Sequence, residues 1–226
     1  MVGGAVFDLD GTLVDYDRSF EVSWTIKLLH DFGAKTGNKS LEEIEGAEVQ
    51  RYLSLSILDR EKKLLGWGYA SARQFLNGWN TEQAFLEKMR FSYCYSDVPS
   101  LLRLAERKLK LGIVTSAPRN LADKELEMLS AVLGADLFPH RIYASHGSGI
   151  EMKPSPQGIL LCLEEMGLPP REAIYVGNED NDILAARNAG IKGVLIKRGR
   201  YHTTVEPSFE IASLGEILGL SFPLAS

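Results

Sequence analysis

Short apolar runs alternate with helix-like segments between residues 97 and 196 of this chain. The strand-like runs cover residues 111–115, 141–145, 173–176 and 193–196, and the helix-like segments cover 101–108, 121–133, 156–166 and 181–189. Strands that alternate with helices predict a parallel sheet with helices on both of its faces. A further apolar run, at residues 4–9, ends at Asp10-Gly11 and predicts a buried strand. The sequence therefore predicts an α/β core.

A mostly helical block, at residues 15–95, separates this first strand from the others, and residues 40–95 show no clear strand. Four large apolar side chains recur every four residues, as on one side of a helix: Phe20, Trp24, Leu28 and Phe32. Gly33 and Gly37 are placed to end that helix. We therefore expect two domains, an α/β core made of residues 1–14 and 96–226 and a helical insert at 15–95.

The composition argues against nucleic-acid and membrane partners, although an acidic balance leaves room for a local positive pocket that binds one phosphate. The 226 residues include 25 Lys and Arg and 30 Asp and Glu, a formal net charge of −5, whereas binding along a nucleic-acid backbone needs a clustered basic face. No apolar run reaches the length of about 20 residues that crosses a bilayer, and no signal peptide is evident. Two isolated cysteines, Cys94 and Cys162, fit a reducing compartment. We expect a cytoplasmic monomer or homodimer without nucleic-acid or membrane partners.

Polar side chains collect where the predicted strands end, and in an open parallel sheet reactive groups gather beyond the carboxyl ends of the strands. Four ends carry carboxylates, hydroxyls and one lysine: Asp8, Asp10, Gly11 and Thr12; Thr115 and Ser116; Lys153; and Gly177, Asn178, Glu179, Asp180 and Asp182. Such groups suit a metal-assisted reaction on a phosphate.

Asp8 and Asp10 are two residues apart, so on an extended strand their side chains leave on the same face. Two close carboxylates are costly to keep ionised, so one of them binds a cation or carries a proton. Mg²⁺ prefers oxygen ligands, and a carboxylate with a raised pKa serves as a general acid and base. Taken alone, the segment also allows a turn in which Asp and Thr side chains cap a helix.

In their order and spacing, these groups resemble the four motifs of the haloacid dehalogenase superfamily, which consists mainly of phosphatases. Asp8-Leu9-Asp10-Gly11-Thr12-Leu13 resembles the first motif, Thr115 the second, Lys153-Pro154 the third and residues 177–182 the fourth. The chain looks like the phosphoglycolate-phosphatase-like subgroup. That resemblance implies a Rossmann-like core, and the block at 15–95 resembles a helical cap domain inserted after the first motif.

The resemblance implies Mg²⁺-dependent hydrolysis of a small phosphorylated metabolite, a phosphate monoester. Asp8 would be the nucleophile that forms an aspartyl-phosphate, and Asp10 would protonate the leaving oxygen and then activate water. Thr115 and Lys153 would hold the transferring phosphoryl group. The further expected substrate-binding residues are Gly11, Thr12 and Ser116, and the expected metal ligands are Asp8, Asp10, Asn178 and Asp182.

Asn178 departs from the family's pattern, which has an acidic metal ligand directly after Gly177. An amide oxygen still coordinates a hard cation, but without a full negative charge. We therefore expect weakened magnesium binding, with Glu179, Asp180 and Asp182 as compensating groups. A catalytically weakened member of the superfamily is one alternative function.

The same residue types also occur in proteins with different activities. A phosphomutase would use Asp8 and Asp10 but keep water away from the aspartyl-phosphate. A haloacid dehalogenase lacks the second aspartate, and nothing marks Lys27 or Lys35 as the Schiff-base lysine of a phosphonate hydrolase. A receiver-like switch module shares acidic, Thr and Lys groups on a parallel sheet but lacks the insert.

The basic stretch at 197–200 predicts a solvated loop. The candidates for substrate selection in the insert are Tyr16, Arg18, Trp24, Trp67 and Arg73.

Overall fold

The chain divides into two compact units, one made of Met1–Asp15 with Tyr93–Ser226 and the other of Tyr16–Ser92. The computed structural model describes residues 2–36, 46–53, 55, 57–67, 78, 81–199 and 203–220. Among these residues, no helix combines the length and the apolar character that a membrane span requires.

The first unit is built on a six-stranded sheet with the strand order β5-β4-β1-β6-β7-β8, in which every neighbouring pair is parallel. The strands are β1 (Gly4–Phe7), β4 (Lys110–Thr115), β5 (His140–Tyr143), β6 (Ala173–Gly177), β7 (Lys192–Ile196) and β8 (Phe209–Ile211). The predicted parallel α/β fold is confirmed.

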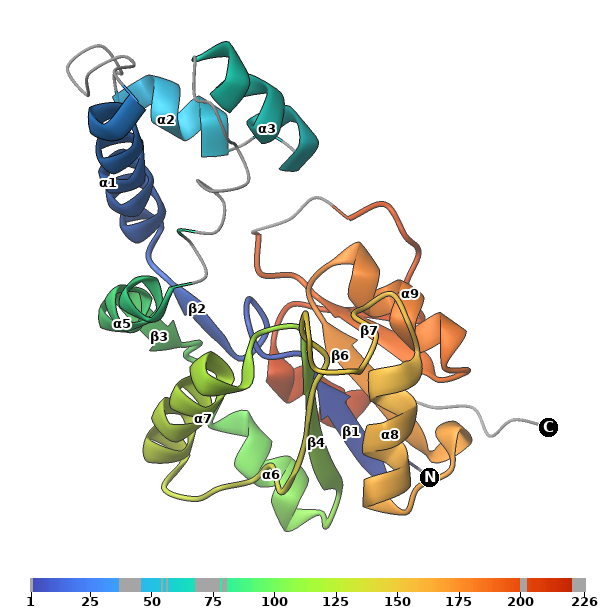
Figure 1. Ribbon diagram of the computed structural model, residues 1–226. Helices are drawn as coiled ribbons and strands as arrows, with labels where there is room; N and C mark the ends of the chain where they lie inside the picture. Colours follow the sequence, from blue (N-terminus) through green and yellow to red (C-terminus); the bar gives the residue numbers. More distant parts are fainter. Residues whose placement is uncertain are drawn as a thin grey trace. The chain divides into compact units, whose positions relative to one another are not determined.

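Helices cover both faces of this sheet, with α6 and α7 on one side and α8 and α9 on the other (Figure 1). The helices of this unit are α6 (Ser100–Glu106), α7 (Arg119–Leu133), α8 (Gln157–Met166) and α9 (Asp180–Asn188), with two 3-10 helices, η3 (Pro170–Glu172) and η4 (Leu214–Gly219). Successive side chains of a strand point to opposite faces. Phe7 therefore belongs to the same buried cluster as Leu126 of α7, whereas Val6 belongs to the cluster of Ile159 of α8. Two apolar layers thus hold the strands between them.

The strand register brings the carboxyl ends of the central strands together. Phe7, the last residue of β1, lies opposite Ile113 of β4 and Val176 of β6. Because the strands are parallel, the segments that follow β1, β4 and β6 all begin at the same edge of the sheet. Each of the three segments carries residues predicted from the sequence to be functional.

The second unit contains α1 (Arg18–Thr36), α2 (Gly46–Leu53), α3 (Ile57–Gly66) and α5 (Glu82–Phe91). Phe20, Trp24 and Leu28 are buried along α1, as the four-residue spacing predicts. The prediction that Gly33 ends this helix is wrong, because α1 continues to Thr36. One glycine costs a helix only about 1 kcal/mol, which packing of the buried stripe can offset. Gly37 lies outside the described residues.

Two three-residue strands also differ from the expected helical block at 15–95. They are β2 (Val14–Tyr16) and β3 (Ser92–Cys94), which pair in a separate two-stranded sheet. A strand of three residues is too short to show the alternation of apolar and polar side chains from which strands are predicted.

Candidate active site

A tight loop follows β1 and carries three of the predicted residues. The Leu9 carbonyl accepts hydrogen bonds from the amides of Thr12, Leu13 and Val14, at 3.2, 2.9 and 3.2 Å. Gly11 has a φ of +75°, and a Cβ atom there would lie 2.3 Å from Nδ2 of Asn178. Only glycine suits that position, because other residues are strained at positive φ and the space is already filled.

Lys153 joins two buried carboxylates at this loop. Its Nζ lies 2.6 Å from Oδ1 of Asp8 and 2.6 Å from Oδ1 of Asp182, and the side chains of the three residues are 5%, 7% and 0% exposed, in the order Lys153, Asp8, Asp182. Oδ2 of Asp8 accepts a hydrogen bond of 3.1 Å from the Thr12 hydroxyl. Both oxygens of the Asp8 carboxylate are therefore held in place, by groups from two different segments of the chain.

Burial dominates the electrostatics of this cluster. It raises the pKa of Asp8 to about 7, and the nearby ammonium of Lys153 opposes that rise. Burial alone would lower the pKa of Lys153, but the carboxylates of Asp182 and Asp8 raise it well above its ordinary value. Lys153 is therefore charged, and it is the one cation that these contacts place against Asp8 and Asp182 within the described part of the chain.

Asp182 is occupied by protein donors on both oxygens. Its Oδ1 accepts from Lys153, and its Oδ2 accepts from the backbone amides of Asn178 at 2.9 Å and Glu179 at 3.1 Å. Glu179 in turn caps α9, and its side chain accepts the amide of Asp182. This geometry supports a role in orienting Lys153 and the loop between β6 and α9. The expectation that Asp182 helps to hold a metal ion or its waters stays a prediction.

Asn178 is 6% exposed and faces the loop after β1. The Thr12 hydroxyl lies 3.3 Å from its Oδ1 and 3.1 Å from Oδ2 of Asp8, but one hydroxyl proton serves only one of these acceptors. Nδ2 of Asn178 is buried without a hydrogen-bond partner among the described residues. Rotating the amide by half a turn resolves the first conflict, because Nδ2 then donates to the Thr12 hydroxyl. Oδ1 then takes the buried position beside Gly11, where no donor from the described residues meets it.

The remaining predicted residues lie around the same sheet edge. Asp10 forms an isolated β-bridge with Val14. Thr115 ends β4 and is buried, and its hydroxyl accepts the Ala117 amide at 3.0 Å, while the neighbouring Ser116 is half-buried. The structure thus brings segments from four parts of the chain to one place.

Two of the groups expected to compensate for Asn178 are engaged elsewhere. The Asp180 carboxylate accepts hydrogen bonds from the amides of Thr204 and Val205 and from the Thr204 hydroxyl. Glu179 serves as the α9 cap, and burial raises the pKa of its carboxyl group. Both carboxylates therefore accept hydrogen bonds that stabilise the α9 end and the segment at Thr204.

Tyr175 is a residue of this cluster that the motifs of the sequence do not single out. Its hydroxyl lies 3.0 Å from the carbonyl of Val114 and 3.4 Å from Oδ1 of Asp182, and Nζ of Lys153 lies 5.8 Å from the ring centroid. The residue is fully buried within β6. A tyrosine inside an apolar strand carries a hydroxyl that must find a partner, and this is the signal by which it could have been found.

Among the side chains proposed to select substrate, Trp24 and Trp67 are buried in the helical unit's own core. Their indole N–H groups donate to the carbonyl of Gly78 and the carboxylate of Glu48. The Tyr16 hydroxyl donates to Glu21, and Arg73 lies outside the described residues. Both tryptophans therefore serve the packing of that unit.

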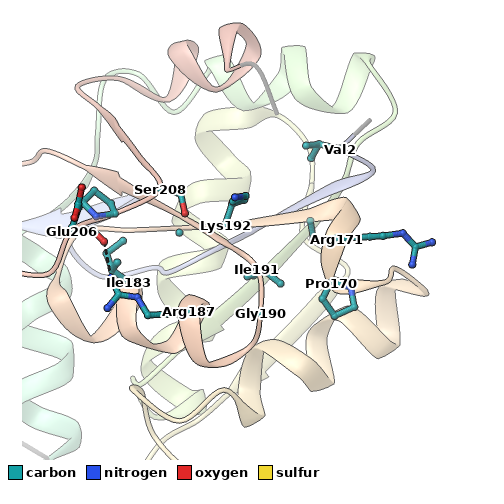
Figure 2. Close-up of a pocket in the computed structure, with 13 residues that line it drawn as sticks. Val2, Pro170, Arg171, Ile183, Arg187, Gly190, Ile191, Lys192, Glu206 and Ser208 are labelled. Atoms are coloured by element: carbon teal, nitrogen blue, oxygen red, sulfur yellow. Dashed lines mark hydrogen bonds between the residues drawn. The ribbon is translucent and has the colours of Figure 1, made fainter. Parts of the chain in front are cut away.

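A cavity of about 470 Å³ lies away from these residues (Figure 2). Its walls include Ala173 and Lys192, the first residues of β6 and β7, and Arg187 on α9. It therefore lies toward the amino ends of the strands, whereas Asp8 follows the carboxyl end of β1. None of the predicted site residues lines it.

The residues around Asp8 suit a small hard cation in the chemistry of their donors. The carboxyl groups of Asp8 and Asp182 face the single ammonium of Lys153, and Asp10 adds a third carboxyl group two residues after Asp8. In the rotated orientation, the amide of Asn178 would offer a neutral oxygen, which is a ligand type that Mg²⁺ accepts. No group of three or more His, Cys, Asp or Glu side chains in the described residues is arranged to hold a metal. With an amide at position 178 in place of an acidic residue, the donor set has one carboxylate fewer than the family's pattern.

Residues 5–196 match the family described as haloacid dehalogenase-like hydrolase. The chain is 31% identical to the glyceraldehyde 3-phosphate phosphatase of Methanopyrus kandleri, an alignment that covers 100% of this chain and 99% of the relative. It is 26% identical to the phosphoglycolate phosphatase of Aquifex aeolicus, over 95% of this chain and 94% of the relative.

The fold is similar to that of a solved haloacid dehalogenase-like hydrolase from Bacteroides fragilis. The two structures superpose with a TM-score of 0.69 at 20% identity, covering 96% of this chain and all of the other. At this level of identity the similarity concerns the fold.

Proposed function

We propose, since this chain belongs to the haloacid dehalogenase-like hydrolase family, that it hydrolyses small phosphate monoesters with Asp8 as nucleophile and Mg²⁺ as cofactor. The observation that carries the proposal is the buried ammonium of Lys153, 2.6 Å from both Asp8 and Asp182 at the end of the central strand β1. Such an arrangement fixes a carboxylate and places positive charge where a phosphoryl group would arrive.

In the first step, an oxygen of the Asp8 carboxylate attacks the phosphorus atom of the ester. A new bond forms between that oxygen and phosphorus, and the bond between phosphorus and the ester oxygen breaks. Asp10 donates its proton to the departing oxygen, which leaves as an alcohol. The product of this step is a phosphoryl group bound covalently to Asp8.

In the second step, Asp10, now ionised, takes a proton from water as the water oxygen attacks phosphorus. The bond between phosphorus and the Asp8 oxygen breaks, which releases inorganic phosphate and restores the carboxylate of Asp8. Asp10 ends the cycle protonated, as it began. The balance is one ester and one water consumed, and one alcohol and one phosphate released.

The surrounding groups position the phosphoryl oxygens. Lys153 and the hydroxyls of Thr115 and Ser116 offer donors. Gly11 shapes the loop that presents Asp8, because only glycine fits against Asn178 there. A bound Mg²⁺ would neutralise charge on the transferring phosphoryl group, held by Asp8, the backbone of Asp10 and the amide oxygen of Asn178. Asp182 keeps Lys153 in place.

The helical unit, Tyr16–Ser92, is proposed to act as a cap that selects the substrate. Closure of such a unit over a reacting group excludes bulk water. Relatives differ in the phosphate compounds that their names specify, and these compounds define the substrates to test first.

The proposal is tested by measuring the release of inorganic phosphate from four compounds, with and without Mg²⁺. They are glyceraldehyde 3-phosphate, phosphoglycolate, N-acetylmuramic acid 6-phosphate and pyrophosphate, after the names of the relatives. The matched control is Asp8→Asn, which keeps the size of the side chain. Release that depends on Mg²⁺ and disappears in the control is expected. Release that persists in Asp8→Asn would contradict the assignment of the nucleophile.

A phosphomutase would give a different result in the same experiment. With a hexose phosphate, it would form an isomeric sugar phosphate and little free phosphate. Product analysis therefore separates the two reactions, and phosphate is the product that we expect.

A further inference from the structure

Arg198 follows β7 and is buried, although the sequence predicts a solvated loop at residues 197–200. Its side chain is only 7% exposed. The guanidinium group donates two hydrogen bonds to the carbonyl of Thr12, from Nε at 3.2 Å and from Nη2 at 2.8 Å. Thr12 belongs to the loop that positions Asp8. A residue 186 positions away in the chain thus holds the proposed catalytic loop directly.

The same guanidinium group is anchored on its other side by Asp97. Nη1 and Nη2 donate to the two oxygens of that carboxylate, each at 2.9 Å. The amide of Leu214 also donates to Asp97, at 2.8 Å. Burial would raise the pKa of Asp97, but the hydrogen bonds from Arg198 and Leu214 hold it below its ordinary value. Asp97 is therefore an ionised and oriented anchor.

Tyr95 completes the contact. Its ring lies under the guanidinium carbon of Arg198 at 3.9 Å, and its backbone amide donates to the carbonyl of Leu13 at 3.0 Å. The Tyr95 hydroxyl donates to Asp15 at 2.6 Å. Arg198 and Tyr95 therefore donate hydrogen bonds to two successive carbonyls of the loop after β1, those of Thr12 and Leu13. Asp97 holds Arg198 in the orientation that this requires.

We infer that Arg198 is a positioning residue for the proposed phosphatase reaction, because it fixes the loop from which Asp10 and Thr12 act. The inference rests on the proposed function. Its physical basis is the planar guanidinium group of arginine, whose several nitrogens donate to one carbonyl and one carboxylate at the same time. The donors of lysine all lie on one nitrogen atom. A displaced Thr12 carbonyl would move the hydroxyl that holds Asp8, and misplacement by about 1 Å can reduce turnover on the order of 100-fold.

The first test compares Arg198→Ala, Arg198→Lys and a matched control, Arg187→Ala, by measuring kcat and KM for p-nitrophenyl phosphate. Arg187 also donates to a backbone carbonyl, that of Glu206, but on an exposed part of α9. We expect kcat to fall on the order of 100-fold in Arg198→Ala, and nearly as far in Arg198→Lys, with little change in KM. The control should keep kcat within about twofold of the wild type.

Rescue by a small molecule distinguishes positioning from a general loss of structure. Added guanidinium at millimolar concentration should restore part of kcat in Arg198→Ala and none in the control. The double variant Asp97→Asn/Arg198→Met, which leaves no unpaired buried charge, should fold and still show the low kcat. A kcat close to the wild-type value in either folded variant would overturn the inference.

Hydrogen exchange tests the same contact without turnover. The amides of Leu13 and Val14, which bond to the Leu9 carbonyl, should exchange faster in Arg198→Ala and at the wild-type rate in Arg187→Ala. Unchanged exchange in Arg198→Ala would overturn the inference even if kcat fell. If the wild type releases no phosphate but hydrogen exchange responds as expected, the proposed function is wrong, whereas the role of Arg198 in holding the loop after β1 is supported.

Discussion

At the scale of single residues, two buried ion pairs hold Asp8, Lys153 and Asp182 together, and the three side chains are almost completely shielded from water. A buried pair of charges adds little net stability, but removing one partner leaves the other uncompensated. The cluster therefore fixes the geometry of the site, and the stability of the protein falls if one of its charged partners is removed.

Replacing Lys153 by methionine should show this dependence. The change removes the ammonium and leaves Asp8 and Asp182 facing each other in a buried space, so the free energy of unfolding should fall by about 3–5 kcal/mol. Urea denaturation measures the loss, with exposed Lys192→Met as the control. A loss below about 1 kcal/mol, the scale of a surface ion pair, would show that water reaches the cluster.

Asn178→Asp should strengthen the binding of magnesium and weaken the metal-free protein. The new carboxylate restores a negative ligand but repels Asp8 and Asp182 when no cation is bound. The half-saturating Mg²⁺ concentration should fall roughly tenfold, equal to about 1.4 kcal/mol. In thermal denaturation, the melting temperature should be lower than the wild type's with a chelator and should rise more when Mg²⁺ is added. If the melting curve of Asn178→Asp is the same with and without Mg²⁺, a metal site at position 178 is contradicted.

At the scale of elements, the turn from β6 into α9 depends on a glycine. A Cβ atom on Gly177 would lie 2.3–2.4 Å from three atoms of the Asp182 side chain. Since Asp182 also caps the turn and holds Lys153, any shift of its side chain disturbs the whole site. The close approach of strand and helix is therefore part of how the site is assembled.

Gly177→Ala should lower both stability and activity. Overpacking of a filled space costs about 1–3 kcal/mol, and the displaced Asp182 should release Lys153 and reduce kcat. Gly66→Ala is the matched control, because a Cβ there meets nothing within 4 Å. Its free energy of unfolding should stay the same or rise by about 0.4–1 kcal/mol. Full activity in Gly177→Ala would show that Asp182 tolerates displacement.

At the scale of the whole molecule, the buried apolar clusters separate along the same line as the two units. Two clusters draw only on the first unit, and the third, around Phe20, Trp24 and Tyr52, draws only on the second. All residues proposed to carry the chemistry lie in the first unit. Each unit thus has a core of its own, which is a property of an independently folding domain.

Replacing residues 17–91 by a short Gly-Ser linker should therefore leave a folded α/β unit. The amide of Asp17 donates to the carbonyl of Phe91 at 3.0 Å, so the linker has little distance to span. Circular dichroism and urea titration should show one cooperative transition. Phosphate release from p-nitrophenyl phosphate should persist, while discrimination between larger esters is lost. An unfolded product would show that the first unit depends on the helical one.

Much of this protein could be predicted from its sequence, because the relevant signals are local. Alternating apolar and helical segments predict the parallel sheet, and strand ends predict where polar groups collect. The four-residue stripe of α1 and the ordered groups Asp8, Thr115 and Lys153 likewise depend on spacing along the chain. The strands β2 and β3 were not predicted, because their three residues each carry too little periodicity and lie beside helical segments.

Tertiary structure alone decided how those groups are partnered. No local pattern tells that Lys153 bridges Asp8 and Asp182, that Asp180 instead holds Thr204, or that Arg198 is buried against Thr12. Each of these contacts joins segments that the sheet brings together from distant parts of the chain. The periodicity of apolar residues reports the local secondary structure, whereas the charged partner of a side chain depends on which strands lie side by side in the sheet.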